Sequence, residues 1–328
     1  MKTIRWGIIG CGDVTEVKSG PGFQRAEHSE LVAVMRRQGA LAEDYAKRHQ
    51  VKKWYDDADA LINDPEVDAV YIATPPANHM EYTLRCAKAG KPVYVEKPMA
   101  RNYSECEAMV KACEEAGVEL FVAYYRRALP RFLKVKELIE QGSIGDIRFI
   151  TITLYQKPRE NEYAEETRPW RVIPEIAGGG KFLDLASHTL DIFDFILGPI
   201  AEAAGMASNQ AGLYQAEDIV TANLKFDSGV HGMGTWCFTA YEDYDMNEIV
   251  GSEGKIRFST FGNEPVEWIT SGEKKVFDLD NPKHIQEPLI QTIVNELNGV
   301  ESCPSKGISG ARTNKVMDDI LKSYNGLR

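Results

Sequence analysis

Cysteine, long apolar runs and basic charge are all scarce in this sequence, and each scarcity excludes a class of protein. The 328 residues include only 6 cysteines, and no two of them form a C-x-x-C pair. A disulfide-stapled scaffold is therefore excluded, and we expect reduced thiols in a cytoplasmic protein. No apolar run approaches the roughly 18 residues that cross a bilayer, and the opening residues lack the hydrophobic stretch of a signal peptide. We expect no membrane partner.

Basic residues are outnumbered by acidic ones. The chain has 38 Lys and Arg against 49 Asp and Glu, for a formal net charge of −11 at pH 7. This sign is wrong for a protein that neutralises a phosphate backbone, so nucleic acid is not an expected partner. The sequence also lacks the H-E-x-x-H motif, Cys/His zinc spacings and the G-x-S-x-G nucleophile elbow. These absences leave no support for a metal site or for acyl-enzyme chemistry.

The remaining composition is that of an ordinary compact protein. Hydrophobic residues make up 43% and charged residues 27%, and a chain of this length holds about two domains at roughly 100–200 residues each. The first 123 residues alternate short apolar runs with amphipathic ones, which is typical of parallel strands joined by helices. This half is predicted to be a doubly wound, Rossmann-type α/β domain. Its predicted strands are 4–9, 31–35, 69–73, 92–95 and 119–122, and its predicted helices are 41–49, 79–89 and 104–116.

The pattern changes in residues 124–328. Turn signals such as Asp227-Ser228-Gly229 separate neighbouring β-branched runs by only a few residues, which is too short for crossover helices. We therefore predict a second, α+β domain with a large, mostly antiparallel sheet that binds substrate and mediates oligomerisation. The polar segment 159–175 is predicted to be a long loop, either a lid or a solvated surface, and the helix 310–324 packs on one domain or the other. The predicted strands are 147–155, 219–226, 230–238, 248–250, 255–259 and 266–270, and the predicted helices are 130–141, 185–197, 288–297 and 310–324.

A glycine turn follows the first predicted strand. Gly10 and Gly12 provide the first two glycines of a dinucleotide-binding fingerprint, and Thr15 stands where the third is usual. Such a turn lets the backbone N–H groups around Asp13 and Val14 approach a pyrophosphate at a helix N-terminus. A simple strand-to-helix turn is the alternative reading, but the position in the first βα unit favours the cofactor.

Two arginines follow the second predicted strand. Dinucleotide folds contact the adenosine ribose there, and an acidic residue would bind both hydroxyls of NAD. This chain has Arg36 and Arg37 instead. Two guanidiniums favour a 2′-phosphate through charge and bidentate hydrogen bonds, so we expect NADP(H) to be preferred, with NAD(H) as the other possibility. The alternative is that both arginines are solvated surface charges.

Two further segments follow predicted strands, at the edge where open parallel sheets bind ligands. One contains Thr74-Pro75-Pro76 and His79, and the other is Glu96-Lys97-Pro98. Together with the glycine turn and a distant Gly178-Gly179-Gly180 followed by Asp184 and His188, they resemble the Gfo/Idh/MocA family of glucose-fructose oxidoreductase and inositol dehydrogenase. The resemblance covers essentially the whole chain, and it places Thr74, Pro75, His79, Glu96 and Lys97 in the cofactor site.

The resemblance also assigns the chemistry. It implies that Lys97 faces the substrate hydroxyl, where a cation stabilises alkoxide character as hydride leaves the carbon. It implies that His188 is the general acid/base and that Asp184 binds substrate hydroxyls or orients the imidazole. Asp184 and His188 are four residues apart at the start of a predicted helix and so share one face. For Lys97, the alternative is a solvated side chain or a partner of Glu96. For His188, the alternative is a buried histidine at a helix N-terminus.

Three aromatic and basic residues complete the predicted site. Tyr125 occupies a position where relatives often carry asparagine, and it is a candidate for substrate binding. Trp170 and Arg171 resemble a pair that approaches the nicotinamide in many relatives, although Trp170 could instead anchor a loop.

These features predict an enzyme that transfers hydride between nicotinamide and a sugar, polyol or related cyclic alcohol or ketone, with the nicotinamide in the crevice between domains. One alternative is a nicotinamide-dependent glycosidase of the same family. The other is a non-catalytic, nucleotide-binding regulatory protein. Relatives pair through the second sheet, so we expect a homodimer or homotetramer.

Overall fold

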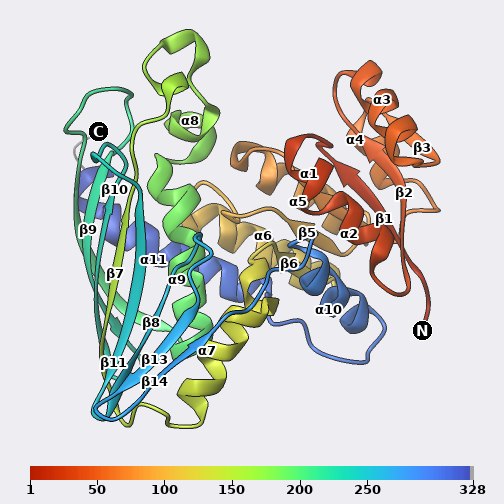
Figure 1. The fold of residues 1–328 in the computed structure, drawn as a ribbon. Helices are drawn as coiled ribbons and strands as arrows, with labels where there is room; N and C mark the ends of the chain where they lie inside the picture. The colour runs from red at the N-terminus through yellow and green to blue at the C-terminus, as the bar shows by residue number, and fades with distance from the viewer. Residues whose placement is uncertain (326–328) are drawn as a thin grey trace. The chain divides into compact units, whose positions relative to one another are not determined.

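The computed structural model describes residues 1–325, and the chain divides into two compact units (Figure 1). Unit 1 comprises residues 1–129 and 282–311, and unit 2 comprises residues 130–281 and 312–328. The long C-terminal helix α11 (Gly307–Asn325) contributes its first turn to unit 1 and the rest to unit 2. The domain boundary expected after residue 123 stays a prediction. Within residues 1–325, no helix combines the length and the apolar character needed to cross a membrane.

Unit 1 contains a parallel sheet of six strands in the order β3-β2-β1-β4-β5-β6. This is the doubly wound arrangement predicted from the alternating pattern, so the Rossmann-type fold is confirmed. Every residue of β4, β5 and β6 is buried, which explains why these strands are continuous apolar runs rather than alternating ones. The six strands are β1 (Ile4–Ile9), β2 (Ser29–Met35), β3 (Lys53–Tyr55), β4 (Ala69–Ile72), β5 (Val93–Val95) and β6 (Leu120–Val122).

Helices cover both faces of this sheet (Figure 1). On one face, α5 and α6 pack through Cys86, Cys106 and Met109 against the apolar side chains of β4 and β5. On the other face, the Phe23 ring of α2 lies 5.1 Å from the Tyr71 ring of β4. The helices of unit 1, besides the start of α11, are α1 (Asp13–Val17), α2 (Gly20–Arg25), α3 (Gly39–His49), α4 (Ala58–Ile62), α5 (His79–Lys88), α6 (Tyr103–Ala116) and α10 (Glu287–Leu297).

Unit 2 contains a sheet of eight strands in the order β14-β13-β12-β11-β7-β10-β9-β8. All neighbours are antiparallel except β7 and β10, which run parallel, so the mostly antiparallel sheet is confirmed. The strands are β7 (Ile147–Tyr155), β8 (Ile200–Ser208), β9 (Ile219–Phe226), β10 (His231–Cys237), β11 (Tyr244–Gly251), β12 (Gly254–Phe258), β13 (Val266–Thr270) and β14 (Lys274–Phe277).

In the described part of unit 2, helices cover one face of the second sheet. The Phe182 ring of α9 (Lys181–Leu197) lies 5.1 Å from Trp236 of β10, and the Phe132 ring of α7 (Pro130–Glu140) lies 6.1 Å from Phe258 of β12. The opposite face carries exposed side chains, including Met206 and Met233. The strands therefore alternate between buried and exposed residues, as β9 and β10 do along most of their lengths.

Candidate active site

The glycine turn lies at the carboxyl end of β1 and leads directly into α1. Gly10 has a φ of +90°, and a Cβ there would lie 2.8 Å from Thr74 Cγ2 and 3.0 Å from Thr74 N. Both the backbone conformation and the close approach of the Thr74 segment therefore require glycine. A Cβ at Gly12 would meet a single neighbour within 4 Å, the Gly10 carbonyl oxygen at 3.9 Å. The space beside the first turn of α1 is thus open.

Thr15 accounts for the missing third glycine. Its hydroxyl accepts a hydrogen bond from Gly12 N at 2.9 Å and lies 2.8 Å from Gly12 O, to which it donates. The Thr15 carbonyl in turn accepts from the Tyr45 hydroxyl of α3 at 2.9 Å. A buried threonine therefore closes the turn where a close glycine contact is usual. The helix α1 is short, because the Gly20-Pro21-Gly22 segment starts a new helix.

The two arginines after β2 are exposed at the same edge of the sheet. Arg36 Nη1 donates to the carbonyl of Cys11 in the glycine turn, at 3.4 Å. Burial raises the pKa of the Cys11 thiol to about 11, and the charge of Arg36 opposes that shift. A guanidinium thus lies beside the turn, and Cys11 is a neutral thiol at physiological pH.

His79 connects the segments that follow β4 and β5. The ring is fully buried. Its Nε2 lies 2.7 Å from the Thr74 carbonyl, and its Nδ1 lies 3.2 Å and 3.1 Å from the carbonyls of Pro98 and Met99. Burial lowers the pKa of His79, while these carbonyls oppose the shift. His79 therefore braces two loops of the site, and a direct contact with a cofactor stays a prediction, as it does for Thr74 and Pro75.

Lys97 follows β5, and the buried carboxylate of Glu96 precedes it. Glu96 Oε2 accepts a hydrogen bond from the backbone N–H of Lys97 at 3.2 Å. Its Oε1 accepts one from Gln286 Nε2 at 2.7 Å and another from the hydroxyl of Tyr71. The glycine turn, Thr74, His79 and the Pro98 carbonyl are therefore linked by direct contacts within unit 1, and Lys97 lies next to Pro98 in the chain.

In unit 2, the triple glycine positions α9. A Cβ at Gly180 would lie 2.8 Å from the Glu217 carbonyl oxygen and 2.9 Å from Ala216 Cβ. Only a residue without a side chain lets the helix start this close to the segment that precedes β9. Gly180 N also donates to Glu217 Oε1 at 2.7 Å. This contact satisfies one of the N–H groups at the start of the helix.

Asp184 and His188 lie in the first two turns of α9, as predicted. The His188 side chain is buried, and its ring lies 5.7 Å from the Phe261 ring in an edge-on arrangement. Asp184 Oδ2 pairs with Arg171 Nε at 3.2 Å, and the Arg171 guanidinium lies 4.5 Å from the centre of the Trp170 ring. The structure therefore brings together three residues predicted to be functional.

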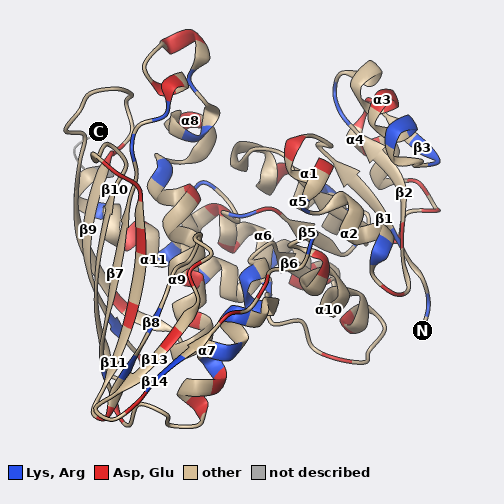
Figure 2. Ribbon diagram, in the orientation of Figure 1, with Lys and Arg blue, Asp and Glu red and all other residues tan. Residues whose placement is uncertain are grey.

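The segment 159–175 is anchored to unit 2 at several points, although it is rich in acidic residues (Figure 2). Glu162 forms an ion pair with Lys181 of α9 in which the side chains are only 1% and 9% exposed. Arg168 Nη2 donates to the Leu213 carbonyl at 2.8 Å, and Val172 packs against Tyr214 and Ala216. The short helix α8 (Pro174–Ala177) ends the segment.

Tyr125 lies in a helical turn after β6, in unit 1. Its side chain is buried, and the Arg126 guanidinium lies 5.0 Å from the centre of its ring. Its predicted contact with substrate stays a prediction.

The residues of unit 1 fit a dinucleotide. A glycine turn leads into a helix start beside open space, and a guanidinium flanks the turn at the carboxyl edge of a parallel sheet, where such folds bind nucleotides. Among residues 1–325, no group of three or more His, Cys, Asp or Glu side chains is arranged to hold a metal ion.

Several contacts at this site had no signal in the sequence. Gln286 reaches Glu96 across 190 residues, and Lys181 pairs with Glu162 across a stretch that contains the triple glycine. The Arg171–Asp184 pair joins two flagged residues whose pairing was not predicted. No local pattern connects these residues, because folding alone makes them neighbours.

Comparisons with known proteins agree with this geometry. Residues 4–124 match the family described as "Oxidoreductase family, NAD-binding Rossmann fold", and residues 132–257 match the "GFO/IDH/MocA C-terminal domain". Oxidoreductase P35 of Formosa agariphila is 41% identical over 315 residues, which are 96% of this chain and 97% of that protein. The 1,5-anhydro-D-fructose reductase of Ensifer adhaerens is 31% identical over 254 residues, which are 77% of this chain and 74% of that protein.

A solved structure shows the same fold. The aldose-aldose oxidoreductase from Caulobacter crescentus, complexed with glycerol, superposes with a TM-score of 0.87 at 23% identity and covers 100% of this chain and 99% of its own. Both halves of the chain and most of its length are thus shared with known oxidoreductases. The protein belongs to the Gfo/Idh/MocA family of oxidoreductases, whose N-terminal domain is an NAD-binding Rossmann fold.

Proposed function

We propose that the protein is an NADP(H)-preferring dehydrogenase or reductase that acts on an alcohol or carbonyl carbon of a sugar, polyol or related cyclic compound. The observation that carries the proposal is the chain of contacts within unit 1, from Gly10 through Thr74 and His79 to the segment of Lys97. It joins a dinucleotide-type turn to a lysine at the ligand-binding edge of the sheet. A bound nicotinamide would supply the hydride donor or acceptor.

Lys97 acts on the oxygen of the reacting carbon. Its ammonium stabilises negative charge on that oxygen as an alcohol loses hydride, because a fixed positive charge lowers the energy of a developing alkoxide. In the reducing direction, the same ammonium polarises the carbonyl oxygen. The backbone N–H of Lys97 is held by the buried carboxylate of Glu96, so the start of this side chain has a defined position.

His188 moves the proton. The imidazole takes the hydroxyl proton in oxidation and returns it in reduction, which is ordinary general acid/base catalysis. Its place in the buried helix α9 gives it a fixed direction. Asp184 binds substrate hydroxyls or steers the imidazole, and the Arg171 guanidinium pairs with its carboxylate. Tyr125 is proposed as a substrate contact, and Trp170 and Arg171 as cofactor contacts.

The preference for NADP(H) is supported by the charge at the end of β2. Arg36 reaches the glycine turn, and Arg37 is exposed beside it. Two cations attract a 2′-phosphate and offer it bidentate donors.

The substrate class is supported by the names of relatives. A relative at 31% identity is a reductase of 1,5-anhydro-D-fructose, and the superposed structure is an aldose-aldose oxidoreductase.

A coenzyme and substrate panel tests the proposal. Polyols, aldoses, ketoses and 1,5-anhydro-D-fructose are each incubated with NADP(H) and with NAD(H), and the absorbance of reduced coenzyme is followed. We expect turnover with at least one sugar or polyol and a higher kcat/KM with NADP(H). Turnover with NAD(H) alone would overturn the cofactor assignment. Product formation without net coenzyme change would indicate the glycosidase, and binding of coenzyme without any turnover would indicate the regulatory protein.

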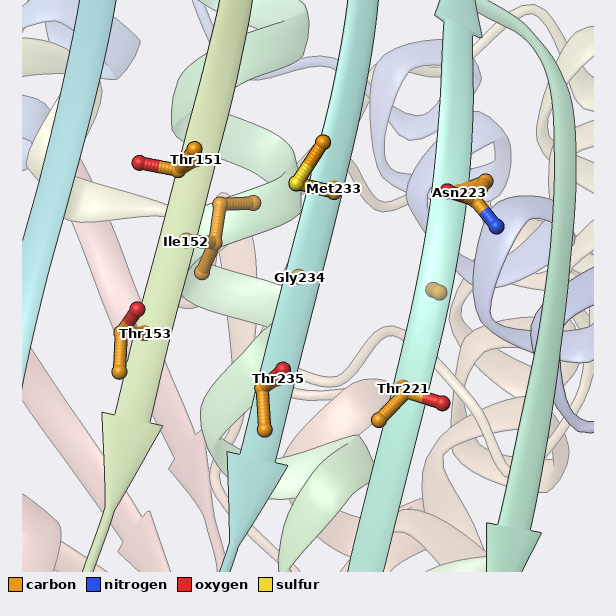
Figure 3. Close-up of a pocket in the computed structure, with 9 residues that line it drawn as sticks. Thr151, Ile152, Thr153, Thr221, Asn223, Met233, Gly234 and Thr235 are labelled. Carbon is orange, nitrogen blue, oxygen red and sulfur yellow. The ribbon is translucent and has the colours of Figure 1, made fainter.

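We also propose that the protein self-associates as a homodimer or homotetramer through the open face of the second sheet. Met206 and Met233 are 76% and 53% exposed there. Figure 3 shows Met233 beside Asn223 and a set of threonines on β7, β9 and β10. These residues line a hollow of about 310 Å³. An exposed face with methionines and short polar side chains suits contact with a second copy of the same face.

A cytoplasmic location is proposed on the chemistry of the thiols. Cys11, Cys86, Cys113 and Cys303 are free and buried. Burial raises the pKa of Cys11 to about 11 and that of Cys113 to about 12. Neutral, buried thiols of this kind are typical of proteins that stay in a reducing compartment.

A further inference from the structure

A buried network of polar side chains lies on the α10 face of the first sheet, behind the Lys97 loop. Tyr71 and Tyr94 are partners in the register of β4 and β5, and their rings stack at 4.9 Å. Gln286, which precedes α10, is fully buried between the Tyr94 hydroxyl and Glu96. These three residues and Glu96 come from three separate stretches of the chain, yet they form one connected group.

Each hydrogen bond in the network has a defined direction. The Tyr94 hydroxyl donates to Gln286 Oε1 at 2.8 Å, and Gln286 Nε2 donates to Glu96 Oε1 at 2.7 Å. The Tyr71 hydroxyl also donates to Glu96 Oε1. The other carboxylate oxygen, Oε2, accepts from the backbone N–H of Lys97 at 3.2 Å. The network therefore ends on the main chain of the proposed catalytic lysine.

Gln286 also contacts the end of α1. Its backbone N–H donates to the Lys18 carbonyl at 3.3 Å, and the preceding His284 Nδ1 lies 3.1 Å from the Val17 carbonyl. The helix that starts at the glycine turn and the loop that carries Lys97 are thus tied to the same residue. The contact with α1 is made by the Gln286 backbone, so a change of the side chain leaves that contact in place.

We propose that Gln286 is a positioning residue for Lys97, acting through the Glu96 carboxylate. The proposal rests on the catalytic role proposed for Lys97. A carboxylate can only accept hydrogen bonds, so it needs donors on each oxygen to keep one orientation in a buried site. Tyr71 and Gln286 supply the donors on Oε1, which leaves Oε2 directed at Lys97 N.

Glutamine is the side chain that satisfies both neighbours. Its amide donates to Glu96 and its carbonyl accepts from Tyr94, so the carboxamide cannot flip without placing like groups together. Methionine has a similar length and no hydrogen-bonding amide, and it would release both partners. Tyr94 would lose its acceptor and Glu96 one of its donors, while the volume in the core is nearly conserved.

The test compares Gln286→Met with Gln291→Met. Gln291 lies in α10, the helix that Gln286 precedes, but its amide bonds Asn295 and the Glu27 backbone near the surface, so it is the matched control. Amide hydrogen exchange of the peptide that contains Lys97 is measured first. Pro98 has no N–H, so it adds no exchange signal next to that of Lys97. We expect Lys97 to exchange about tenfold faster in Q286M, since loss of a donor to a charged group weakens the remaining hydrogen bonds. Unchanged protection would overturn the proposal.

Steady-state kinetics provide the second readout, with the best substrate of the panel. We expect kcat of Q286M to fall about 10- to 100-fold, because a displacement near 1 Å at a reacting group has effects of that size. KM and the coenzyme Kd, measured from NADPH fluorescence, should stay within about threefold, since substrate and coenzyme are still bound. A kcat within twofold of wild type, or an equal loss in Q291M, would overturn the proposal.

Two further variants keep the result interpretable. Tyr71→Phe keeps the stacked ring and removes one donor to Glu96, so it should reproduce both effects if Q286M does not fold. Lys97→Met distinguishes the catalytic role proposed for Lys97 from the positioning role proposed for Gln286. Full activity of K97M would overturn the proposed role of Lys97, and the exchange data would still decide whether Gln286 orders this loop. An inactive K97M with a normal Q286M would overturn the positioning role alone.

Discussion

The two sheets of this protein are buried in different ways. The parallel sheet of unit 1 has helices on both faces, and its central strands are buried along their whole length. The eight-stranded sheet of unit 2 packs its own helices on one face and leaves the other exposed. The first arrangement leaves only the strand ends for function. The second leaves an entire face for it.

This difference explains how each unit presents its polar groups. In unit 1, the predicted functional residues lie in loops at the carboxyl ends of strands, and buried side chains such as His79 and Glu96 brace those loops. In unit 2, Asp184 and His188 lie on a helix behind the sheet, and buried charges set the start of that helix. The predicted catalytic residues thus lie in a loop in one unit and on a helix in the other.

The sharpest test of this division is the removal of one proposed catalytic group from each unit. We expect Lys97→Met and His188→Asn each to lower kcat by about 10²- to 10⁴-fold, the range for charge stabilisation and general acid/base groups. The double variant should lose much less than the product of the two effects, because groups that act on one step are not additive. Lys88→Met, on the exposed end of α5, is the control. Additive losses would mean that the two groups act in separate steps.

Variants of the buried Glu162–Lys181 ion pair test whether this pair of charges stabilises the start of α9. Lys181→Met leaves the Glu162 carboxylate buried without its partner, and we expect a loss of about 3–5 kcal/mol in the free energy of unfolding. The double variant Glu162→Leu/Lys181→Met should recover most of this loss, because no isolated charge remains. Lys225→Met breaks an exposed pair with Glu202 on the same unit and should change stability by about 1 kcal/mol or less. Denaturant unfolding measures all three, and equal effects of K181M and K225M would contradict the argument.

The proposed role of Arg36 and Arg37 in binding the 2′-phosphate is tested by removing their charges. We expect Arg36→Ala/Arg37→Ala to lower kcat/KM for NADPH by about 10- to 100-fold, the equivalent of one or two charge-assisted hydrogen bonds. The value for NADH should change by less than about threefold, since it has no 2′-phosphate. Raising the salt concentration should weaken NADPH binding to the wild type more than to the variant. A parallel loss for both coenzymes would show that the arginines support the fold rather than the phosphate.

The open face of unit 2 is tested by placing charge on it. Met206→Glu/Met233→Glu should raise the dissociation constant of the oligomer at least about 30-fold, the effect of losing one central contact. Light scattering after size-exclusion chromatography measures the mass directly. Leu84→Glu, on an exposed helix of unit 1, should leave the mass unchanged. A variant with the wild-type mass would place the interface elsewhere.

The smallest expected effect concerns acid stability of unit 1. Arg48 and His49 of α3 hold the pKa of Glu16 in α1 at about 2, below its ordinary value of 4.5. Because the folded pKa is the lower one, the stability from this contact is present above pH 4.5 and is lost as pH falls toward 2. Thermal unfolding of Glu16→Gln should therefore differ from wild type near neutral pH and converge with it in acid. A constant difference across this range would contradict the assignment.

Regular elements were well predicted where local pattern and burial agree. The strands β1, β7, β9 and β13 have the predicted bounds, because their apolar or alternating runs are bounded by clear turns. The strands β3, β8 and β14 were not predicted. β8 contains four alanines and a glycine, residues with little preference for strands, and β14 is a short edge strand with two lysines. Pairing with a neighbour makes them strands.

The candidate site likewise has features that follow from local sequence and contacts that depend on the tertiary fold. Local sequence determined the glycine turn, the arginines after β2, the position of Lys97 after β5 and the placement of Asp184 and His188 on one helix, because turn chemistry and helical period act over a few residues. Tertiary structure alone decided that Gln286 meets Glu96, that Lys181 meets Glu162 and that Arg171 meets Asp184. A polar side chain acquires a particular partner only when burial removes water as the alternative, and burial depends on the whole fold.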